Sequence, residues 1–220
     1  MNSNTVIVRT LGLQEYLVTW LAMQQFTNQR DQDTSDEIWV LEHPPVFTQG
    51  QNGKSAHVHS PGTIPVVQTD RGGQVTYHGP GQLIIYTLID LRRKKFTTRQ
   101  FVTLLEQSVI QLLAAYNVLA KAKCEAPGVY IADKKICSIG LRIRRGCSFH
   151  GLALNVAMDL EPFLSIDPCG FPGLKMAQLT DIHKTAKIKS VAAKLVEHLI
   201  TNLGYTNKLI AKSPYGPKEP

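Results

Sequence analysis

One segment, residues 82–91, constrains the fold more than any other. It reads QLIIYTLIDL, so almost every position is apolar. A strand with one solvated face alternates apolar and polar residues, whereas a near-continuous apolar run is buried on both faces. The run is too short to span a bilayer. We therefore expect a strand inside a sheet that is covered on both sides.

Groups of strands and helices surround this segment. Period-two patterns predict strands over residues 5–10, 37–42, 46–50, 65–69, 129–131, 135–143 and 148–156. Three- and four-residue spacing predicts helices over residues 13–30, 98–117 and 190–203. In the first helix, the apolar face is expected to hold Leu13, Tyr16, Leu17, Trp20 and Leu21. This order of elements predicts an α+β fold, a mixed β-sheet with packed helices.

Turn and cap residues mark the ends of several elements. Tight turns are expected at residues 133–134 and 145–146, and loops over residues 51–62 and 161–176. Ser190 is the expected N-cap of the last helix, and Gly204 its stop. A chain of 220 residues fits one domain. We place it over residues 1–212, followed by a polar, flexible tail over residues 213–220.

The charge balance favours anionic partners. Lys and Arg number 24 against 17 Asp and Glu, which gives a net charge of +7. Nucleic acid and an acidic protein are both anionic, and charge alone does not distinguish them. Nucleic-acid-binding modules interleave basic and aromatic residues, and aromatic residues make up only 7% of this chain. We therefore expect no nucleic-acid partner.

The four cysteines are Cys124, Cys137, Cys147 and Cys169, and they form no C-x-x-C pair. Without a secretory signal in residues 1–9 they are expected to be reduced thiols of a cytoplasmic protein without a metal site. Three of them fall in or beside strands, where core packing is expected. Cys169 lies between Pro168 and Gly170 on a loop, so it is the candidate nucleophile; simple packing is the alternative.

Residues 71–82 read RGGQVTYHGPGQ and hold four glycines. Glycine lets a ligand approach the backbone and its N–H groups. The spacing is not that of the dinucleotide-binding fingerprint. A tight hairpin in which glycines only make turns explains the block equally well.

A third feature is Lys134-Lys135, which precedes the apolar residues of the strand over 135–143. Side chains alternate across a strand, so the two lysines point to opposite faces and one of them can face inward. Solvation of both at a turn is the simpler alternative.

Taken together, these motifs resemble those of the octanoyltransferases of lipoate biosynthesis. The resemblance rests on His43-Pro44-Pro45 and on residues 71–82, 127–130, 135–140, 149–156 and 168–170. It implies a fold like the catalytic domain of biotin and lipoate protein ligases. It also implies a ping-pong reaction in which Cys169 carries the acyl group and Lys135 assists the thiol. Asp167 stands where many relatives have Asn.

The same resemblance implies the substrate contacts and the partners. The substrate-binding residues would be Arg71, Gly72, Gly73, Gln74, Val75, Thr76, Tyr77, His78, Ser138, Ile139, Gly140, Gly151, Leu152 and Ala153. The donor would be octanoyl-acyl carrier protein. The acceptors would be lipoyl domains of 2-oxoacid dehydrogenase complexes and the glycine cleavage H protein. No cofactor, metal or membrane is implied, and the enzyme would act as a monomer.

Two questions stay open at this stage. Residues 92–95 and 142–145 are basic runs that could dock acidic partners, although ordinary solvation explains them as well. An ATP-dependent lipoate or biotin ligase with the same fold is the rival function. Such an enzyme makes an acyl-adenylate and needs no nucleophilic cysteine, so the Cys169 loop argues against it.

Overall fold

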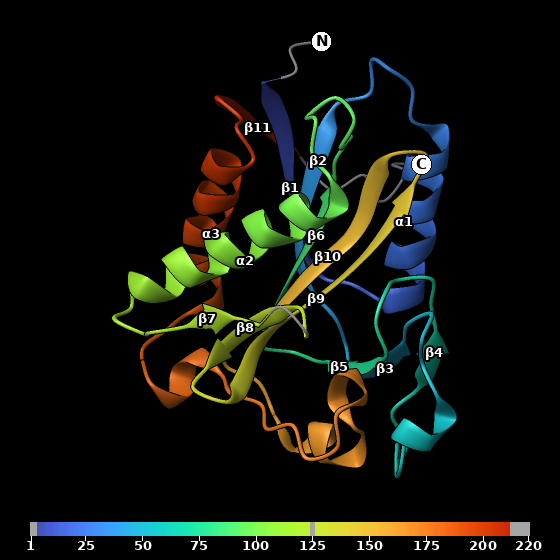
Figure 1. The fold of residues 1–220 in the computed structure, drawn as a ribbon, viewed down its shortest axis with the longest axis vertical. Helices are drawn as coiled ribbons and strands as arrows, with labels where there is room; N and C mark the ends of the chain where they lie inside the picture. Colours follow the sequence, from blue (N-terminus) through green and yellow to red (C-terminus); the bar gives the residue numbers. More distant parts are fainter. Residues whose placement is uncertain (1–3, 124–125, 212–220) are drawn as a thin grey trace, which may run out of the picture.

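The computed structural model describes residues 4–123 and 126–211. An eight-stranded sheet crosses the molecule in the order β11-β1-β2-β6-β10-β9-β8-β7, and a three-stranded sheet β4-β3-β5 lies at one end of it (Figure 1). The strands of the large sheet are β1 (Thr5–Leu13), β2 (Asp36–Glu42), β6 (Gln82–Leu88), β7 (Lys121–Ala122), β8 (Gly128–Ile131), β9 (Lys134–Arg144), β10 (Cys147–Asn155) and β11 (Asn207–Ala211). The small sheet is formed by β3 (Val46–Gln49), β4 (Val66–Gln68) and β5 (Val75–His78).

Both sheets are mixed, as predicted. In the large sheet β1 pairs in parallel with β2 and β11, and the other neighbours are antiparallel. In the small sheet β3 pairs in parallel with β4 and antiparallel with β5. The helices are α1 (Tyr16–Gln29), α2 (Thr98–Ala114) and α3 (Ile188–Asn202). The predicted α+β class is confirmed.

The central strand β6 is buried on both faces, as its composition predicted. Leu83 and Ile85 belong to the core that α2 and α3 cover, whereas Ile84 and Tyr86 belong to a second core under α1. Alternation along the strand therefore divides its side chains between two layers of helices. Figure 1 shows α2 and α3 on one side of the sheet and α1 on the other.

The ends of the helices follow the predictions only in part. Thr97 and Gln100 form a reciprocal capping box that begins α2. Gly204 has φ +69° just past the end of α3, as expected for a helix stop. Ser190 is not an N-cap, because α3 begins at Ile188 with Lys187 as the capping position. Among the residues that the structure describes, no side chain caps that end.

The predicted apolar face of the first helix is only partly right: Tyr16 is buried and Trp20 packs against the second core, but Leu13 lies in β1 and is exposed. The buried residues of α1 are Tyr16, Thr19, Met23 and Thr27, whereas Leu17 and Leu21 are exposed. Apolar residues occur all around this helix, so their spacing does not select one face. The hydroxyl of Thr19 donates to the carbonyl of Glu15, which allows a polar side chain to be buried.

Several local features were missed or displaced. The patterns did not predict β5, β7 or β11. The first tight turn is formed by residues 132–133, one position earlier than expected, whereas the turn at residues 145–146 is confirmed by two positive φ angles. Cys137 and Cys147 are buried, as predicted. The expectations for Cys124 and for the tail over residues 213–220 lie outside the described residues.

Candidate active site

The closest contact between predicted catalytic groups joins Lys135 and Cys169. The ammonium Nζ of Lys135 donates a hydrogen bond of 3.0 Å to the Cys169 Sγ. Lys135 is fully buried at the start of β9, and Cys169 is half-buried in the short 3₁₀ segment Pro168–Gly170. Residues 34 positions apart therefore form a dyad, and the inward-facing lysine is Lys135 rather than the exposed Lys134.

The sheet makes room for the buried lysine. A Cβ on Gly128 would lie 2.6 Å from Cε of Lys135, so only glycine fits beside the lysine stem on β8. The Gly128 amide donates to the buried Glu106 side chain at 2.9 Å, which fixes β8 against α2. The Tyr130 ring centroid lies 5.4 Å from the Lys135 Nζ, a cation–π distance. These contacts hold the lysine in one orientation.

Two sets of hydrogen bonds hold the cysteine loop against this lysine. The Lys135 amide donates to the carbonyl of Lys175, and the Ala177 amide donates to the carbonyl of Lys135, both at 2.9 Å. Upstream of the nucleophile, the Asp167 carboxylate pairs with His57 at 3.0 Å and His59 at 3.1 Å.

The nucleophile itself has an uncommon backbone conformation. Cys169 has φ 59° and ψ 15°, in the left-handed region that costs a non-glycine residue about 1–3 kcal/mol. The next residue, Gly170, also has a positive φ of 76°, and a Cβ there would lie 2.3 Å from the side-chain amide nitrogen of Gln74. The amide of Gln74 therefore lies directly against the nucleophile loop.

The surroundings of the dyad favour the ammonium form of Lys135. Burial lowers the pKa of Lys135, but the charge of the Cys169 thiolate and its hydrogen bond more than offset this, so the pKa is raised above its usual 10.5. Lys135 therefore keeps its proton beside the Cys169 sulfur. The thiolate, rather than the thiol, is the nucleophilic form of cysteine.

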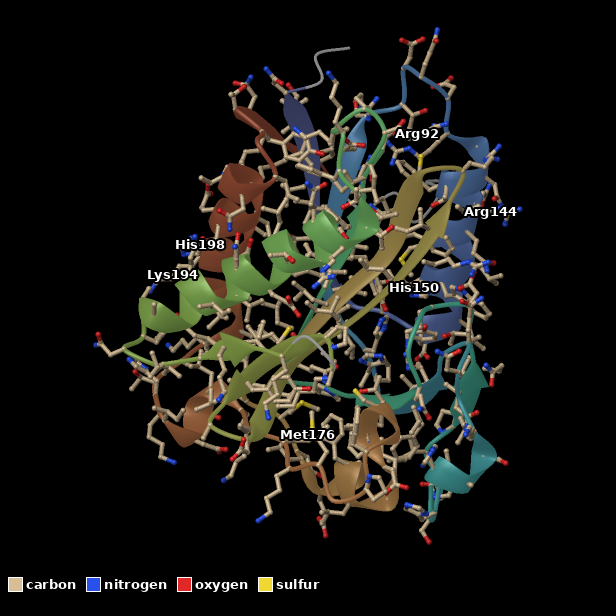
Figure 2. All side chains as sticks on the ribbon, viewed as in Figure 1. Arg92, Arg144, His150, Met176, Lys194 and His198 are labelled. Carbon is tan, nitrogen blue, oxygen red and sulfur yellow. The ribbon has the colours of Figure 1, made fainter. Side chains whose placement is uncertain are left out.

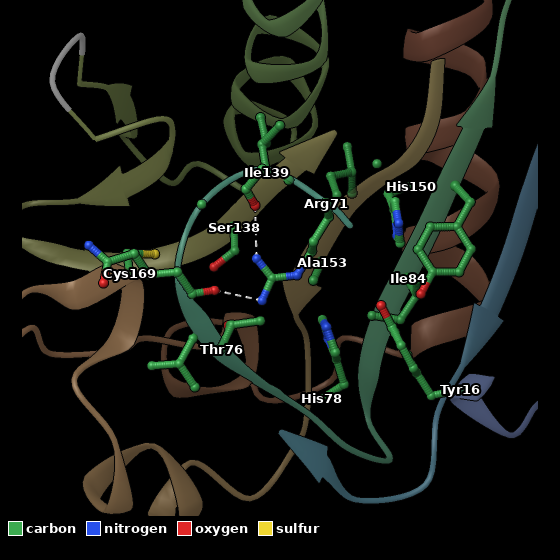
Figure 3. Close-up of a pocket in the computed structure, with 18 residues that line it drawn as sticks. Tyr16, Arg71, Thr76, His78, Ile84, Ser138, Ile139, His150, Ala153 and Cys169 are labelled. Atoms are coloured by element: carbon green, nitrogen blue, oxygen red, sulfur yellow. Dashed lines mark hydrogen bonds between the residues drawn. The ribbon is translucent and has the colours of Figure 1, made fainter. Parts of the chain in front are cut away.

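A narrow pocket extends from the dyad into the molecule. Figure 3 shows Cys169 at one end, Arg71 in the middle, and His150, Ile84 and Tyr16 towards the other end. Its free volume is ≈ 50 Å³. The octanoyl chain expected from the sequence is larger than this, so side chains would have to move for it to enter. We call this cavity the acyl pocket.

The structure brings nearly all of the predicted substrate-binding residues to the acyl pocket. Those that line it are Arg71, Gly72, Gly73, Gln74, Val75, Thr76, His78, Ser138, Ile139, Gly140, Gly151, Leu152 and Ala153. Tyr77 is the exception. It points to the other face of β5, where its ring packs 5.4 Å from Phe47 and 5.5 Å from Phe163. Alternation along a strand explains the difference from its neighbours.

Arg71 shapes the pocket wall instead of presenting a free charge. Its guanidinium donates to the Thr48 carbonyl and hydroxyl and to the carbonyls of Gly72 and Gln74. Within residues 4–123 and 126–211, no carboxylate lies at ion-pair distance from it. Burial lowers its pKa. We infer that Arg71 holds the glycine-rich loop in shape and adds a positive potential near Cys169.

The inner end of the acyl pocket holds polar residues that were not predicted as site residues. Tyr16, Tyr86 and His150 line it together with Ile84. His150 and a neighbouring residue, His43, could have been identified as site residues because they belong to the motifs at residues 149–156 and 43–45. Tyr16 and Tyr86 lie in ordinary helix and strand patterns, and nothing in the sequence sets them apart.

These polar side chains belong to a buried network. His150 Nε2 lies 3.0 Å from the Asp70 carboxylate, which also accepts from the Trp20 indole at 2.7 Å. His43 Nε2 lies 2.7 Å from the Tyr86 hydroxyl. His150 has φ 59°, a left-handed conformation inside β10. The network thus closes the inner end of the pocket.

Two buried histidines, His43 of this network and His78 of the pocket lining, predict a loss of stability in acid. Burial lowers the pKa of His43 to about 4 and that of His78 to about 3, from 6.5. Between those values and 6.5 the unfolded chain binds protons that the folded chain does not, so stability falls as pH falls. Each histidine contributes a slope of about 1.4 kcal/mol per pH unit. Urea unfolding between pH 7 and pH 4.5 measures this slope.

The control for that experiment is a chain without the two titrating groups. In the variant His43→Gln/His78→Gln we expect a flatter dependence over the same range, whatever its stability at pH 7. Equal slopes in the two proteins would show that these histidines are not held neutral in the fold.

Chemically, the site is suited to acyl transfer. It places a cysteine thiol at the mouth of a pocket and a proton carrier beside that thiol. Among the described residues, no group of three or more His, Cys, Asp or Glu side chains is arranged to hold a metal ion. None of the described helices is long and apolar enough to cross a membrane.

Comparison with known proteins gives one consistent result. Residues 13–200 match the model of the lipoyl protein ligase A/B catalytic domain. An octanoyltransferase of Stutzerimonas stutzeri is 59% identical over 208 residues, covering 94% of this chain and 95% of the relative. An octanoyltransferase of Klebsiella pneumoniae is 56% identical over 205 residues, covering 93% and 96%.

Solved structures support the fold at low sequence identity. A lipoate-protein ligase A bound with ATP superimposes with a TM-score of 0.79 at 14% identity, covering 94% of this chain and 89% of that one. A lipoate protein ligase from Thermoplasma acidophilum, described with its E2 lipoyl domain, gives 0.73 at 15% identity and covers 94% and 85%. Biotin protein ligase from Aquifex aeolicus gives 0.54 at 14% identity and covers 90% and 68%. The predicted resemblance to the biotin and lipoate protein ligase fold is confirmed.

Proposed function

Since the chain belongs to the lipoyl protein ligase A/B catalytic domain family, we propose a specific route for its acyl transfer. The protein is an acyltransferase, an octanoyltransferase of protein lipoylation. In the proposed route, octanoyl-acyl carrier protein is the donor and Cys169 carries the octanoyl group as a thioester. The acceptor is a specific lysine of a lipoyl domain.

The observation that carries this proposal is the 3.0 Å contact between Lys135 and Cys169 at the mouth of the acyl pocket. A ligase that activates its acid with ATP needs no nucleophile of its own. Exchange of one thioester for another is close to isoenergetic, so the first step needs no ATP. The dyad is therefore a reason to prefer transfer over ligation on this shared fold.

In the first half-reaction the Cys169 thiolate attacks the carbonyl carbon of the donor thioester. The new C–S bond forms as the bond to the carrier thiol breaks. The leaving thiolate takes a proton from the Lys135 ammonium, so the carrier departs as a neutral thiol. The products are octanoyl-Cys169 and a neutral Lys135 amine.

The second half-reaction depends on the loss of the Cys169 negative charge in the first. Once Cys169 is a thioester, the thiolate that raised the pKa of Lys135 is gone and burial, which lowers it, remains. The neutral amine of Lys135 accepts a proton from the acceptor nitrogen as that nitrogen attacks the thioester. The amide is released, and Cys169 and Lys135 return to the thiolate–ammonium pair.

The proposed acceptors are lipoyl domains of 2-oxoacid dehydrogenase complexes and the glycine cleavage H protein. A structural neighbour described with an E2 lipoyl domain supports this class of acceptor. The donor and the acceptor both meet a protein with a net charge of +7, which favours acidic partners. We propose that the enzyme acts as a monomer in the cytoplasm.

Intact mass spectrometry tests the acyl-enzyme directly. Mixing the protein with octanoyl-acyl carrier protein, without ATP or magnesium, should add one octanoyl group that hydroxylamine removes. Adding a lipoyl domain should then discharge the enzyme and move the same mass to the domain. Transfer that requires ATP, or that leaves the enzyme unmodified throughout, would favour the ligase mechanism.

A further inference from the structure

A second, open cavity lies beside the nucleophile loop. It has a volume of ≈ 940 Å³ and lies between the β8–β9 turn and residues 171–175, which follow the nucleophile in the chain. It shares no lining residue with the acyl pocket. Tyr130 lines it, and the Tyr130 ring faces the Lys135 Nζ at 5.4 Å. The buried Lys135 lies between Tyr130, which lines this cavity, and Cys169.

The charged residues of this cavity are mostly cationic. Lys123, Lys134 and Lys175 line it, with Asp133 as the one carboxylate among its described lining residues. Asp133 pairs with Lys123 at 3.3 Å, so two lysines have no anionic partner there. Phe171, 47% exposed, adds an apolar surface at the same place. We call this cavity the lysine groove.

We propose that the lysine groove binds the phosphopantetheine arm of the acyl donor, with its lysines on the phosphodiester; this rests on the proposed function. The acyl chain and the sulfur-bearing arm of a thioester diverge from its carbonyl carbon. If the acyl chain enters the acyl pocket from Cys169, the thiol-bearing arm must leave on another side of the nucleophile. The lysine groove lies beside the nucleophile loop and outside the acyl pocket.

The positive charge of the lysine groove favours the acyl donor over the acceptor as the molecule bound there. A phosphodiester is an anion and is attracted by clustered lysines. The target lysine of an acceptor domain is a cation before it loses its proton, and the same cluster repels it. The cluster therefore fits a donor arm that combines an anionic phosphate with an uncharged chain.

The basic runs predicted as docking patches lie elsewhere. Arg144 is nine residues beyond Lys135 along β9, which at strand rise is roughly 30 Å. Figure 2 shows Arg92 and Arg144 in the upper part of the molecule and Met176, the neighbour of Lys175, in the lower part. Arg145 donates to backbone carbonyls of Thr27 and Asn28, a structural role. A donor docked on these runs would begin far from the nucleophile.

The test measures the rate of Cys169 acylation with three donors. These are octanoyl-pantetheine, octanoyl-4′-phosphopantetheine and octanoyl-acyl carrier protein. In the unaltered enzyme the phosphate should raise the second-order rate on the order of tenfold. In Lys123→Gln/Lys134→Gln/Lys175→Gln that advantage should vanish, while octanoyl-pantetheine should react at the unaltered rate, which also shows that the variant is folded.

A matched variant removes three positive charges of α2 and β9 that do not line the lysine groove, Arg99→Gln/Arg142→Gln/Arg144→Gln. It should keep the advantage of the phosphorylated donor. Equal rates for the two small donors in the unaltered enzyme, or loss of the advantage only in the arginine variant, would overturn the groove assignment. Failure of every donor to acylate Cys169 would instead reject the proposed function.

Discussion

Cys169→Ser is expected to abolish the octanoyl adduct and to reduce octanoyl transfer by at least about 10³-fold, the scale on which loss of a covalent nucleophile is felt. A serine hydroxyl has no accessible ionised form near neutral pH, and the Lys135 ammonium that supports a thiolate cannot ionise it. The hydrogen bond from Lys135 can persist, so the fold should be kept. Intact mass spectrometry and a transfer assay with a lipoyl domain measure the two effects.

Cys147→Ser is the matched control for this substitution. Cys147 is buried at the start of β10, and its Sγ contacts the backbone carbonyl of Arg145. We expect this variant to form the adduct and to transfer it. If Cys169→Ser retained substantial transfer, the covalent mechanism would have to be abandoned.

Removing the lysine of the dyad should have the second largest effect. Lys135→Ala is expected to slow acylation of Cys169 by about 10²-fold or more, the usual cost of losing an acid–base group. Two functions are lost together: the positive charge beside the thiolate, and the proton for the leaving carrier thiol. Lys135→Met fills the same buried space and should behave alike, which separates the chemical effect from a packing defect. Single-turnover acylation measures the rate.

Lys135→Arg distinguishes the two functions. Arginine keeps the charge but does not release a proton near neutral pH. It should preserve rapid alkylation of Cys169 by iodoacetamide at neutral pH without supporting transfer to the acceptor lysine. An alkylation profile and transfer rate unchanged in Lys135→Ala would show that the lysine is only structural.

Lys134→Ala is the control for these lysine variants. The neighbouring side chain is exposed and points away from Cys169, so its loss should leave the reaction with octanoyl-pantetheine unchanged. The small donor is needed because Lys134 lines the lysine groove. A carrier-protein donor would mix a chemical effect with a binding effect.

Local patterns in the sequence were sufficient for most of the architecture. The apolar run over residues 82–91 predicted a strand buried on both faces, and β6 divides its side chains between two cores. The three- and four-residue spacing of apolar residues over 98–117 predicted α2. Its capping box is formed by Thr97 and Gln100. Period and composition identify such elements because they follow from which side chains leave water.

The same patterns fail where a segment is apolar on every side or too short to show a period. Helix α1 buries Tyr16 and Met23 and exposes Leu17 and Leu21, because the sheet and the acyl pocket, rather than its own spacing, determine its inner face. Strand β5 lies inside the glycine-rich block, where four residues are too few to show alternation. Its alternation nevertheless directs His78 into the pocket and Tyr77 away from it.

Local patterns were enough to identify the candidate groups: a cysteine on a Pro/Gly loop, a lysine that can face inward, and a glycine-rich block. How these groups lie relative to one another follows only from the fold. Lys135 and Cys169 are 34 residues apart, and their 3.0 Å contact depends on the hydrogen bonds of residues 175 and 177 to β9. The network at the inner end of the pocket joins α1, β6 and β10 with Asp70. Such contacts bring together segments that carry no mutual signal in the chain, because distance in space is set by the packing of the whole sheet.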